Sequence, residues 1–172
     1  MQERILIEKA KNGNQRAFKT LFDNNVNVLF RYLRQFSNDR DQVEDWVQRS
    51  FIKAFRNIFS FQGKSTFKTW LFRIAINEMR SDFRLISNNR TEEFEENNHS
   101  EYDNDDFEWQ DEMKWLLSET EDLKKSVFIL FEIEGYKHYE IAEMLDISES
   151  YSKTTLHRVK KLLKEKWLAE AR

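Results

Sequence analysis

Cysteine and proline are absent from this 172-residue sequence, and glycine occurs only 3 times. Without cysteine, the chain can form no disulfide, thiolate metal site or cysteine nucleophile, and it suits a reducing compartment. A sandwich or barrel of many strands needs turn-forming residues at each hairpin, so the shortage of glycine and proline argues against those folds. The composition therefore favours helices joined by short polar turns.

Side chains suited to catalysis are also scarce. The histidines are His99, His138 and His157, and outside the acidic segment described below no carboxylate cluster with metal spacing shares a helical face. These features argue against an enzyme such as a nuclease. We expect no enzymatic activity, no bound metal and no cofactor.

Long uncharged apolar runs are missing as well. Residues 1–11 mix charged with apolar side chains, and no stretch approaches the length of a signal-peptide core or a membrane helix. We therefore expect a cytoplasmic protein without membrane insertion. Hydrophobic residues still make up 40% of the chain and aromatic residues 15%, which is enough to build compact helical cores.

Charge is distributed unevenly along the chain, although the net charge is only -3. Residues 1–91 hold 17 basic and 9 acidic side chains, whereas residues 92–112 hold 11 acidic side chains and no lysine or arginine. This pattern predicts a basic first domain (residues 1–88), an acidic linker (residues 89–112) and a second domain (residues 113–172).

Apolar residues recur at helical spacing on both sides of the predicted linker. A polar turn is expected at residues 37–42, and Ser65 or Thr66 can cap the helix that follows the next loop. The sequence therefore predicts an all-α protein of two small helical domains. The expected helices cover, to within a few residues, 5–11, 17–36, 43–57, 66–83, 113–117, 124–134, 139–145 and 150–169.

The most informative part of the first domain is the helix expected at residues 67–84, together with the loop at residues 59–66. At about 3.6 residues per turn, three arginines and an asparagine of this helix follow one stripe, which suits a phosphate backbone and base edges. The loop adds rings and small polar groups, as single-stranded DNA requires. The alternative is a solvated basic face with the rings in the core. The candidate strand-binding residues are Phe61, Gly63, Lys64, Ser65, Trp70, Arg73, Asn77, Arg80 and Arg84.

Residues 135–165 have the pattern of a DNA-reading helix-turn-helix. A short helix presents Ile141, Ala142 and Leu145 on one face, a turn follows, and a second helix has a basic outer side. The alternative is a plain helical hairpin with a basic tail. The candidate duplex-binding residues are Ser148, Glu149, Ser150, Tyr151, Lys153, Thr154, His157, Arg158 and Lys161.

Three motifs resemble, in order and spacing, those of the extracytoplasmic-function (ECF) group of bacterial RNA polymerase sigma factors. The first lies at residues 41–55 (DQVEDWVQRSFIKAF), the second at residues 61–77 (FQGKSTFKTWLFRIAIN) and the third at residues 134–162. The resemblance covers nearly the whole chain except the acidic linker.

The resemblance implies a role for each motif. The second would melt and read the promoter element nearest the start site, and the helix at residues 149–161 would read the upstream element as duplex. Contacts with the polymerase flap and an anti-sigma protein are also implied. The linker would then thread toward the RNA exit path, or else act as a solubilising tether. The first motif would dock onto the clamp helices of the largest polymerase subunit through Asp45, Gln48, Arg49, Phe51 and Ile52.

The chain departs from the family pattern at several positions. Arg49 stands where an acid is usual, and Asp146 replaces the customary glycine at the turn, where a left-handed backbone tolerates aspartate better than most residues. Ser152 and Thr155 replace a usual valine and arginine, and the Leu-Pro pair that commonly opens the second domain is missing. These departures affect the expected promoter preference more than the assignment to this class of protein.

The resulting hypothesis is a sigma factor that binds core RNA polymerase and directs promoter recognition, strand opening and transcription initiation. The competing hypothesis is a stand-alone helix-turn-helix repressor or activator that binds duplex DNA by itself. The first domain separates the two, because a repressor needs no docking helix and no strand-binding loop.

Overall fold

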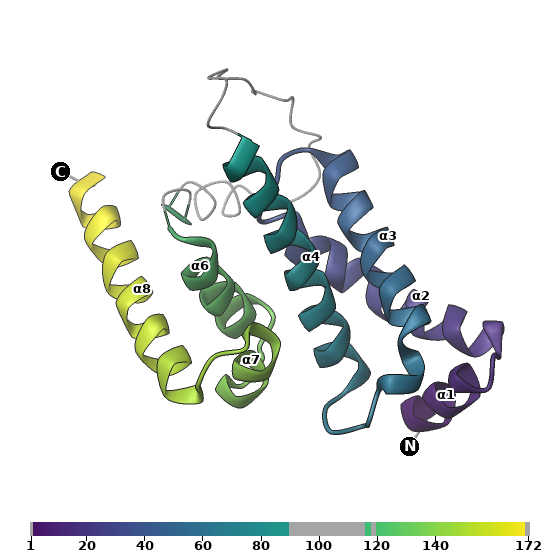
Figure 1. The fold of residues 1–172 in the computed structure, drawn as a ribbon. Coiled ribbons are helices and arrows are strands. Elements are labelled where there is room, and N and C mark those ends of the chain that lie inside the picture. Colours follow the sequence, from purple (N-terminus) through teal and green to yellow (C-terminus); the bar gives the residue numbers. More distant parts are fainter. Residues whose placement is uncertain (1, 90–115, 118–119, 171–172) are drawn as a thin grey trace. The chain divides into compact units, whose positions relative to one another are not determined.

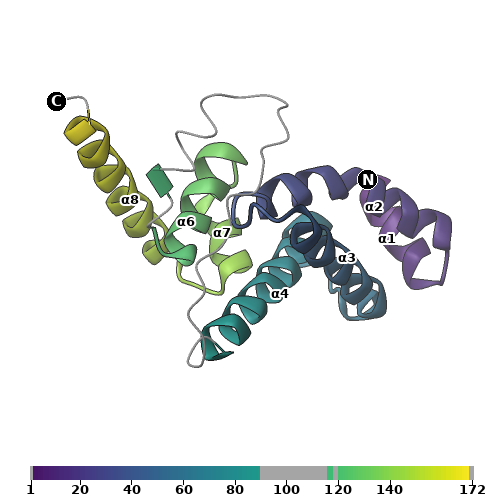
Figure 2. The ribbon, with the colours of Figure 1, turned by 90° about the horizontal axis from the view of Figure 1, so that it is seen from above.

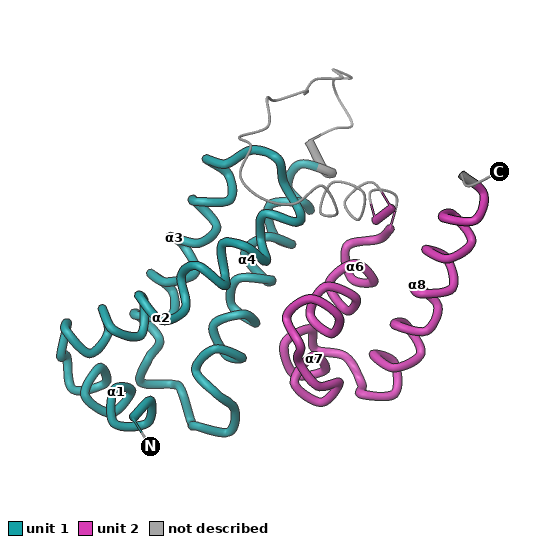
Figure 3. Tube along the Cα trace, turned by 180° about the vertical axis from the view of Figure 1, so that it is seen from behind, with its two compact units in different colours: residues 1–100 teal, residues 101–172 magenta. Residues whose placement is uncertain are grey.

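The structure, a computed structural model, describes residues 2–89, 116–117 and 120–170 (Figure 1). Its helices form two compact units, residues 1–100 and 101–172, coloured separately in Figure 3. The described residues form helices and turns and no strand, which confirms the expected all-α fold with two helical domains. The predicted linker lies outside the described residues apart from Asn89, so its boundaries stay a prediction.

Local sequence signals set the helix starts in the first unit. Asn14 caps α2 by accepting a 3.0 Å hydrogen bond from the backbone N–H of Ala17, and Asp39 caps α3 in the same way, within the polar turn expected there. Thr66, one of the two expected caps, accepts a 3.1 Å bond from the backbone N–H of Thr69. The described elements are α1 (Gln2–Lys11), α2 (Gln15–Leu33), α3 (Arg40–Arg56), the 3₁₀ turn η1 (Ile58–Ser60) and α4 (Phe67–Asn89).

The core of the first unit forms where α3 packs against both α2 and α4, an arrangement that can be followed in Figures 1 and 2. Tyr32, Trp46, Phe67 and Phe72 are fully buried there. Burying a large apolar side chain contributes about 1.5–3 kcal/mol, so these rings hold the three helices in a defined arrangement. Helix α1 packs on α2 and η1.

The second unit contains the expected helix-turn-helix, with helix α6 before it. Helix α6 (Asp122–Phe128) continues into a π-helical turn, η2 (Ile129–Ile133), and is followed by α7 (His138–Leu145) and α8 (Glu149–Glu170). Asp146 ends α7 with φ 56° and ψ 48°, in the left-handed region expected for the position of the usual glycine. Helix α8 packs on both α6 and α7.

Some helix boundaries differ from the expected ones. Helix α4 continues to Asn89, beyond the expected end near residue 83, because the intervening residues contain no glycine or proline to stop it. Helix α2 ends at Leu33 instead of residue 36, and the next residues form a turn in which the N–H of Phe36 bonds to the carbonyl of Leu33. The helix expected at residues 113–117 lies mostly outside the described residues.

Candidate nucleic-acid interfaces and docking surface

The predicted stripe lies on the exposed face of α4. Arg73, Asn77 and Arg84 are exposed and Arg80 is half-buried. The opposite face packs inward through fully buried residues such as Ala75. The structure therefore brings the four polar side chains together along one side of α4, as the helical spacing predicts.

The loop before α4 exposes small and charged residues and packs on a cluster of aromatic side chains. Gly63 has φ +69°, a conformation that other residues rarely adopt, and it is exposed together with Lys64. Phe61 is only 5% exposed, because its ring packs 5.3 Å from that of Trp70 and also contacts Phe67. Phe61 was predicted as a strand contact, and in this structure its ring lies beneath the loop, against Phe67 and Trp70.

Two other predicted contacts at this loop are partly accessible, and a further ring was missed. Ser65 and Trp70 are half-buried, so each presents part of its side chain to solvent. Phe59, in η1, is 74% exposed and was not among the candidate residues. The aromatic content of the loop signalled such a ring, but only the structure separates the exposed Phe59 from the buried Phe61.

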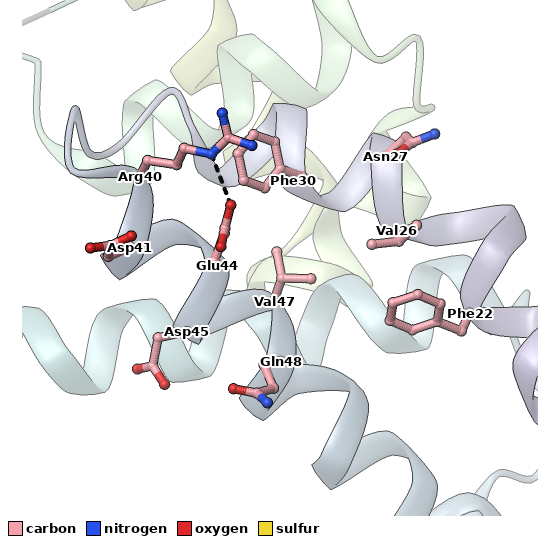
Figure 4. Close-up of a pocket in the computed structure, with 10 residues that line it drawn as sticks. All are labelled: Phe22, Val26, Asn27, Phe30, Arg40, Asp41, Glu44, Asp45, Val47 and Gln48. Atoms are coloured by element: carbon pink, nitrogen blue, oxygen red, sulfur yellow. Dashed lines mark hydrogen bonds and ion pairs between the residues drawn. The ribbon is translucent and has the colours of Figure 1, made fainter. Parts of the chain in front are cut away.

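A groove runs between α2 and α3 and is lined by apolar side chains with an acidic rim (Figure 4). Phe22 and Val26 come from α2, Val47 from α3, and Asp45 and Gln48 lie along its α3 side. Sequence reasoning identified the α3 side but not the α2 side. The signal was present in the apolar spacing of Phe18, Phe22 and Val26, which are four residues apart on one helical face.

A second hollow adjoins this groove and shares Phe22 and Gln48 with it. Ile52 and Phe55 are 42% and 45% exposed, which leaves apolar surface open to a partner. Phe51 is only 4% exposed and its ring lies 4.5 Å from that of Phe22. Phe51 was predicted as a polymerase contact, but its burial makes it part of the groove's floor. We call the two hollows together the α2–α3 groove.

Arg49 faces α4 in this structure. Its Nη1 and Nη2 donate hydrogen bonds to Asp82 on α4 over 3.1 and 2.5 Å. The hydrogen bond with Asp82 is the main reason that the pKa of Arg49 is raised and that of Asp82 is lowered. Three further predicted docking residues, Asp45, Gln48 and Ile52, are exposed.

The outer face of α8 carries all nine predicted duplex-contact residues in exposed positions. Ser148 caps the helix by accepting a 3.0 Å bond from the N–H of Tyr151. Further along, Lys160, Lys161 and Lys164 continue the basic surface. The exposed residues are Ser148, Glu149, Ser150, Tyr151, Lys153, Thr154, His157, Arg158 and Lys161.

The inner face of α8 holds two of the residues that depart from the family pattern, Ser152 and Thr155. Ser152 is fully buried and Thr155 is 3% exposed. The Nδ1 of His138 lies 2.9 Å from the Oγ of Ser152, which joins the start of α7 to α8. Burial is the main reason that the pKa of His138 is lowered, and the positive charge of Lys153 acts in the same direction. Both departures therefore lie on the packed face of α8 and not on its outer face.

Two family descriptions match the chain and correspond to its two units. Sigma-70 region 2 matches residues 21–87, and Sigma-70, region 4 matches residues 121–163. The chain belongs to the ECF group of the sigma-70 family. This sigma-70 family member thus has its region 2 over α2, α3 and α4, and its region 4 over α6, α7 and most of α8.

Relatives align along almost the whole length of this sigma-70 family member. It is 29% identical to the ECF RNA polymerase sigma-E factor of Haemophilus influenzae, over 96% of this chain and 95% of that protein. It is 28% identical to the RNA polymerase sigma-H factor of Pseudomonas aeruginosa, over 94% of this chain and 92% of that one.

Solved structures show the same fold. The structure of CnrH in complex with the cytosolic domain of CnrY matches with a TM-score of 0.77 and 27% identity, covering 98% of this chain and 99% of that one. The sigma factor RpoE of Bartonella quintana, solved with the anti-sigma factor NepR, matches with a TM-score of 0.70 at 24% identity, covering 86% of this chain and 94% of that one.

The helices and side chains of the described residues bear on membrane insertion and on metal binding. None of their helices is both long and apolar enough to cross a lipid bilayer. No group of three or more histidine, aspartate or glutamate side chains among them is placed to hold a metal ion.

Proposed function

We propose that this protein is a transcription initiation factor that brings core RNA polymerase to promoters and opens them. The observation that carries the proposal is the pairing, in one chain, of a helix-turn-helix unit with a unit that has both an apolar docking groove and an exposed cationic stripe. A stand-alone repressor or activator needs only the helix-turn-helix unit, and no observation favours that alternative. The factor acts by binding and strand separation, without covalent chemistry.

The α2–α3 groove is the proposed docking surface for the polymerase. An apolar floor with exposed Ile52 and Phe55 suits the packed face of a helical partner. Asp45 and Gln48 lie at its edge, where they can provide hydrogen bonds and select partner charge. The resemblance to the family favours the clamp helices of the largest polymerase subunit as this partner.

Helix α4 and the loop before it form the proposed strand-binding surface. The stripe from Arg73 to Arg84 supplies cations for the phosphate backbone, and Asn77 can pair with a base edge. The half-buried Trp70 and the exposed loop at Gly63 and Lys64 provide room for an unstacked base. Each base–ring contact is worth about 1–3 kcal/mol, so a few such contacts offset local unpairing of the duplex.

Helix α8 is the proposed reader of the upstream promoter element. Its capped N-terminus and first two turns can enter the major groove, where Ser150, Lys153 and Thr154 meet base edges and phosphates. The opposite face packs on α6 and α7. In the family, the unit that contains this helix also contacts the polymerase flap.

An anti-sigma protein is the proposed regulator. CnrH is a relative that was solved with the cytosolic domain of CnrY bound. An inhibitor that covers the α2–α3 groove would block polymerase docking by competition, because one surface cannot hold two partners. A factor that works on polymerase at the chromosome acts in the cytoplasm, which is the proposed location.

Runoff transcription tests the proposal. Purified protein is added to core polymerase that is free of other sigma factors, with fragments of the source genome as template, and start sites are mapped. We expect discrete start sites that appear only with both proteins. Specific binding of free protein to duplex DNA, without association with polymerase or any new transcript, would contradict the proposal.

A paired variant tests the strand-binding surface in the same assay. Replacing Asn77 and Arg80 by alanine is expected to abolish promoter opening while polymerase binding persists, because neither residue lines the α2–α3 groove. The control is Lys9→Ala, which removes an exposed cation from α1. Unchanged opening by the Asn77 and Arg80 variant would refute the assignment of α4 and leave the docking role standing.

A further inference from the structure

Arg49 joins α3 to α4 through a two-pronged contact. Nη1 donates to Oδ1 of Asp82 over 3.1 Å, and Nη2 donates to Oδ2 of the same carboxylate over 2.5 Å. A bidentate guanidinium–carboxylate pair fixes orientation as well as distance, because both groups are planar and rigid. Nε lies 2.9 Å from Asp45 on α3 itself, as an ion pair without an aligned hydrogen bond.

Asp82 is also held from a second direction. The indole Nε1 of the fully buried Trp46 donates a 2.7 Å hydrogen bond to Oδ2 of Asp82. One turn earlier on α4, Glu78 is only 6% exposed and pairs with Lys53 of α3. Glu78 also lies 3.8 Å from Nη1 of Arg49. The polar contacts therefore span successive turns of both helices, and we call this set the α3–α4 clasp.

The clasp and the cationic stripe occupy different sides of α4. Glu78 and Asp82 face α3, whereas Asn77 and Arg84 lie on the exposed side of the helix. Apolar contacts are non-directional, so by themselves they restrain the rotation of one helix against another less sharply than a directional contact does. A bidentate ion pair is directional, so the clasp fixes the direction in which the stripe faces.

We propose that Arg49 and Asp82 are positioning residues that set α4 for strand capture, and that Arg49 acts in this way instead of contacting the polymerase. The inference rests on the proposed function, because strand capture is part of it. Arg49 is engaged by carboxylates of three residues within its own unit, and its side chain is 34% exposed. Its positive charge is therefore neutralised before any partner approaches, although its helix lines the docking groove.

Two single variants and their combination test this role in full-length protein. Arg49→Ala removes the fork, and Asp82→Asn removes the charge while leaving an amide oxygen for the Trp46 indole. The two single variants and the double variant are each assembled with core polymerase on a promoter located by runoff transcription. Affinity for the core is measured by fluorescence anisotropy, and opening is measured by permanganate reactivity of unpaired thymines.

We expect each single variant to bind the core within about twofold of the wild type and to open the promoter about tenfold less, since hydrogen bonds between charged groups are among the stronger ones. The double variant is expected to be no worse than Arg49→Ala, because both changes break one contact. Arg49→Lys keeps the positive charge but cannot form the bidentate contact. Its promoter opening is expected to lie between that of the wild type and that of Arg49→Ala. The inference would be overturned if Arg49→Ala bound the core more weakly while Asp82→Asn did not, and if the losses of promoter opening added in the double variant. That result would mark Arg49 as a polymerase contact.

Hydrogen exchange of the free protein separates this inference from the proposed function. The clasp predicts faster amide exchange along α4 in Arg49→Ala and Asp82→Asn, with circular dichroism confirming that both variants are folded. If wild-type protein opens no promoter while the exchange changes as expected, the proposed function fails and the clasp stands. Unchanged exchange along α4 in both variants would overturn the clasp whatever the transcription assay gives.

Discussion

His138 and Ser152 form a hydrogen bond of 2.9 Å inside the helix-turn-helix, between the first residue of α7 and the buried face of α8. The His138 ring also stacks on Phe131, with centroids 4.4 Å apart and planes at 22°. Position 152 is buried, and the family usually has valine there. In this protein the hydroxyl of Ser152 has His138 as its hydrogen-bond partner. Arg49 in the docking helix and Ser152 in the helix-turn-helix both depart from the family pattern, and both have polar partners within the fold.

Removing the Ser152 hydroxyl is expected to destabilise the second unit. Ser152→Ala leaves the nitrogen of the half-buried His138 without this partner, and losing such a hydrogen bond costs about 0.5–1.5 kcal/mol. Urea unfolding followed by circular dichroism measures the loss. In His138→Phe with Ser152→Ala the polar pair is replaced by apolar groups that can keep the stack on Phe131, so most of the stability should return. An equal loss in the single and double variants would show that the hydrogen bond does not matter.

Stability should also depend on the protonation of His138. Its pKa is lowered in the folded protein, chiefly by burial and secondarily by Lys153, while Glu149 opposes the shift. The unfolded chain then binds the proton more readily, so the free energy of unfolding should fall as the pH drops below the ordinary histidine pKa of 6.5 and should level off below the folded pKa. Urea unfolding at a series of pH values measures this dependence.

The double variant, His138→Phe with Ser152→Ala, is the control for that pH dependence. It retains every other titrating group, so subtracting its profile isolates His138. Identical profiles for wild type and control between neutral and mildly acid pH would contradict the prediction.

A charge placed in the α2–α3 groove should block docking without unfolding the protein. Ile52 is 42% exposed, so Ile52→Asp is expected to change the free energy of unfolding by no more than about 0.5 kcal/mol. On docking, the carboxylate would be buried against an apolar partner, so affinity for core polymerase should fall by about tenfold or more. Fluorescence anisotropy of each labelled variant, titrated with core polymerase, measures this affinity. The matched control is Ile5→Asp on α1, which is 50% exposed and does not line the groove. Equal affinity of the two variants would argue against the groove as the docking surface.

Two neighbouring lysines of α8 should differ in how they contribute to duplex binding. Lys160 donates a 2.8 Å hydrogen bond to Glu132 of η2, whereas the Nζ of Lys161 lies 3.9 Å from the carboxylate of Glu165. The logarithm of the affinity falls as the logarithm of the salt concentration rises. Lys161→Ala is expected to make this slope less steep by about 1, as the loss of one phosphate contact requires. Lys160→Ala should reduce it less, because its charge is already paired. Binding of the polymerase complex to promoter duplex across a salt series measures both slopes, and equal slopes would contradict the assignment.

Helix periodicity and local signals were sufficient to predict much of this protein. The spacing of Arg73, Asn77 and Arg84 placed them on one exposed face, because about 3.6 residues per turn relates such positions whatever the helix packs against. The left-handed turn at Asp146 and the cap at Thr66 were likewise predictable, since a cap or turn depends on residues a few positions apart.

Other features depended on which helices meet in space. The pairing of Arg49 with Asp82 joins residues 33 positions apart, and the pairing of His138 with Ser152 joins residues 14 apart on different helices. Periodicity alone could not tell that Phe51 and Phe61 are buried while Phe59 is exposed, because an aromatic ring suits both a core and a binding surface. Sequence by itself thus determined the family, the helices and their outward polar faces. Tertiary packing decided which charges are neutralised between helices and which rings are left for a partner, because those outcomes depend on contacts between segments far apart in the chain.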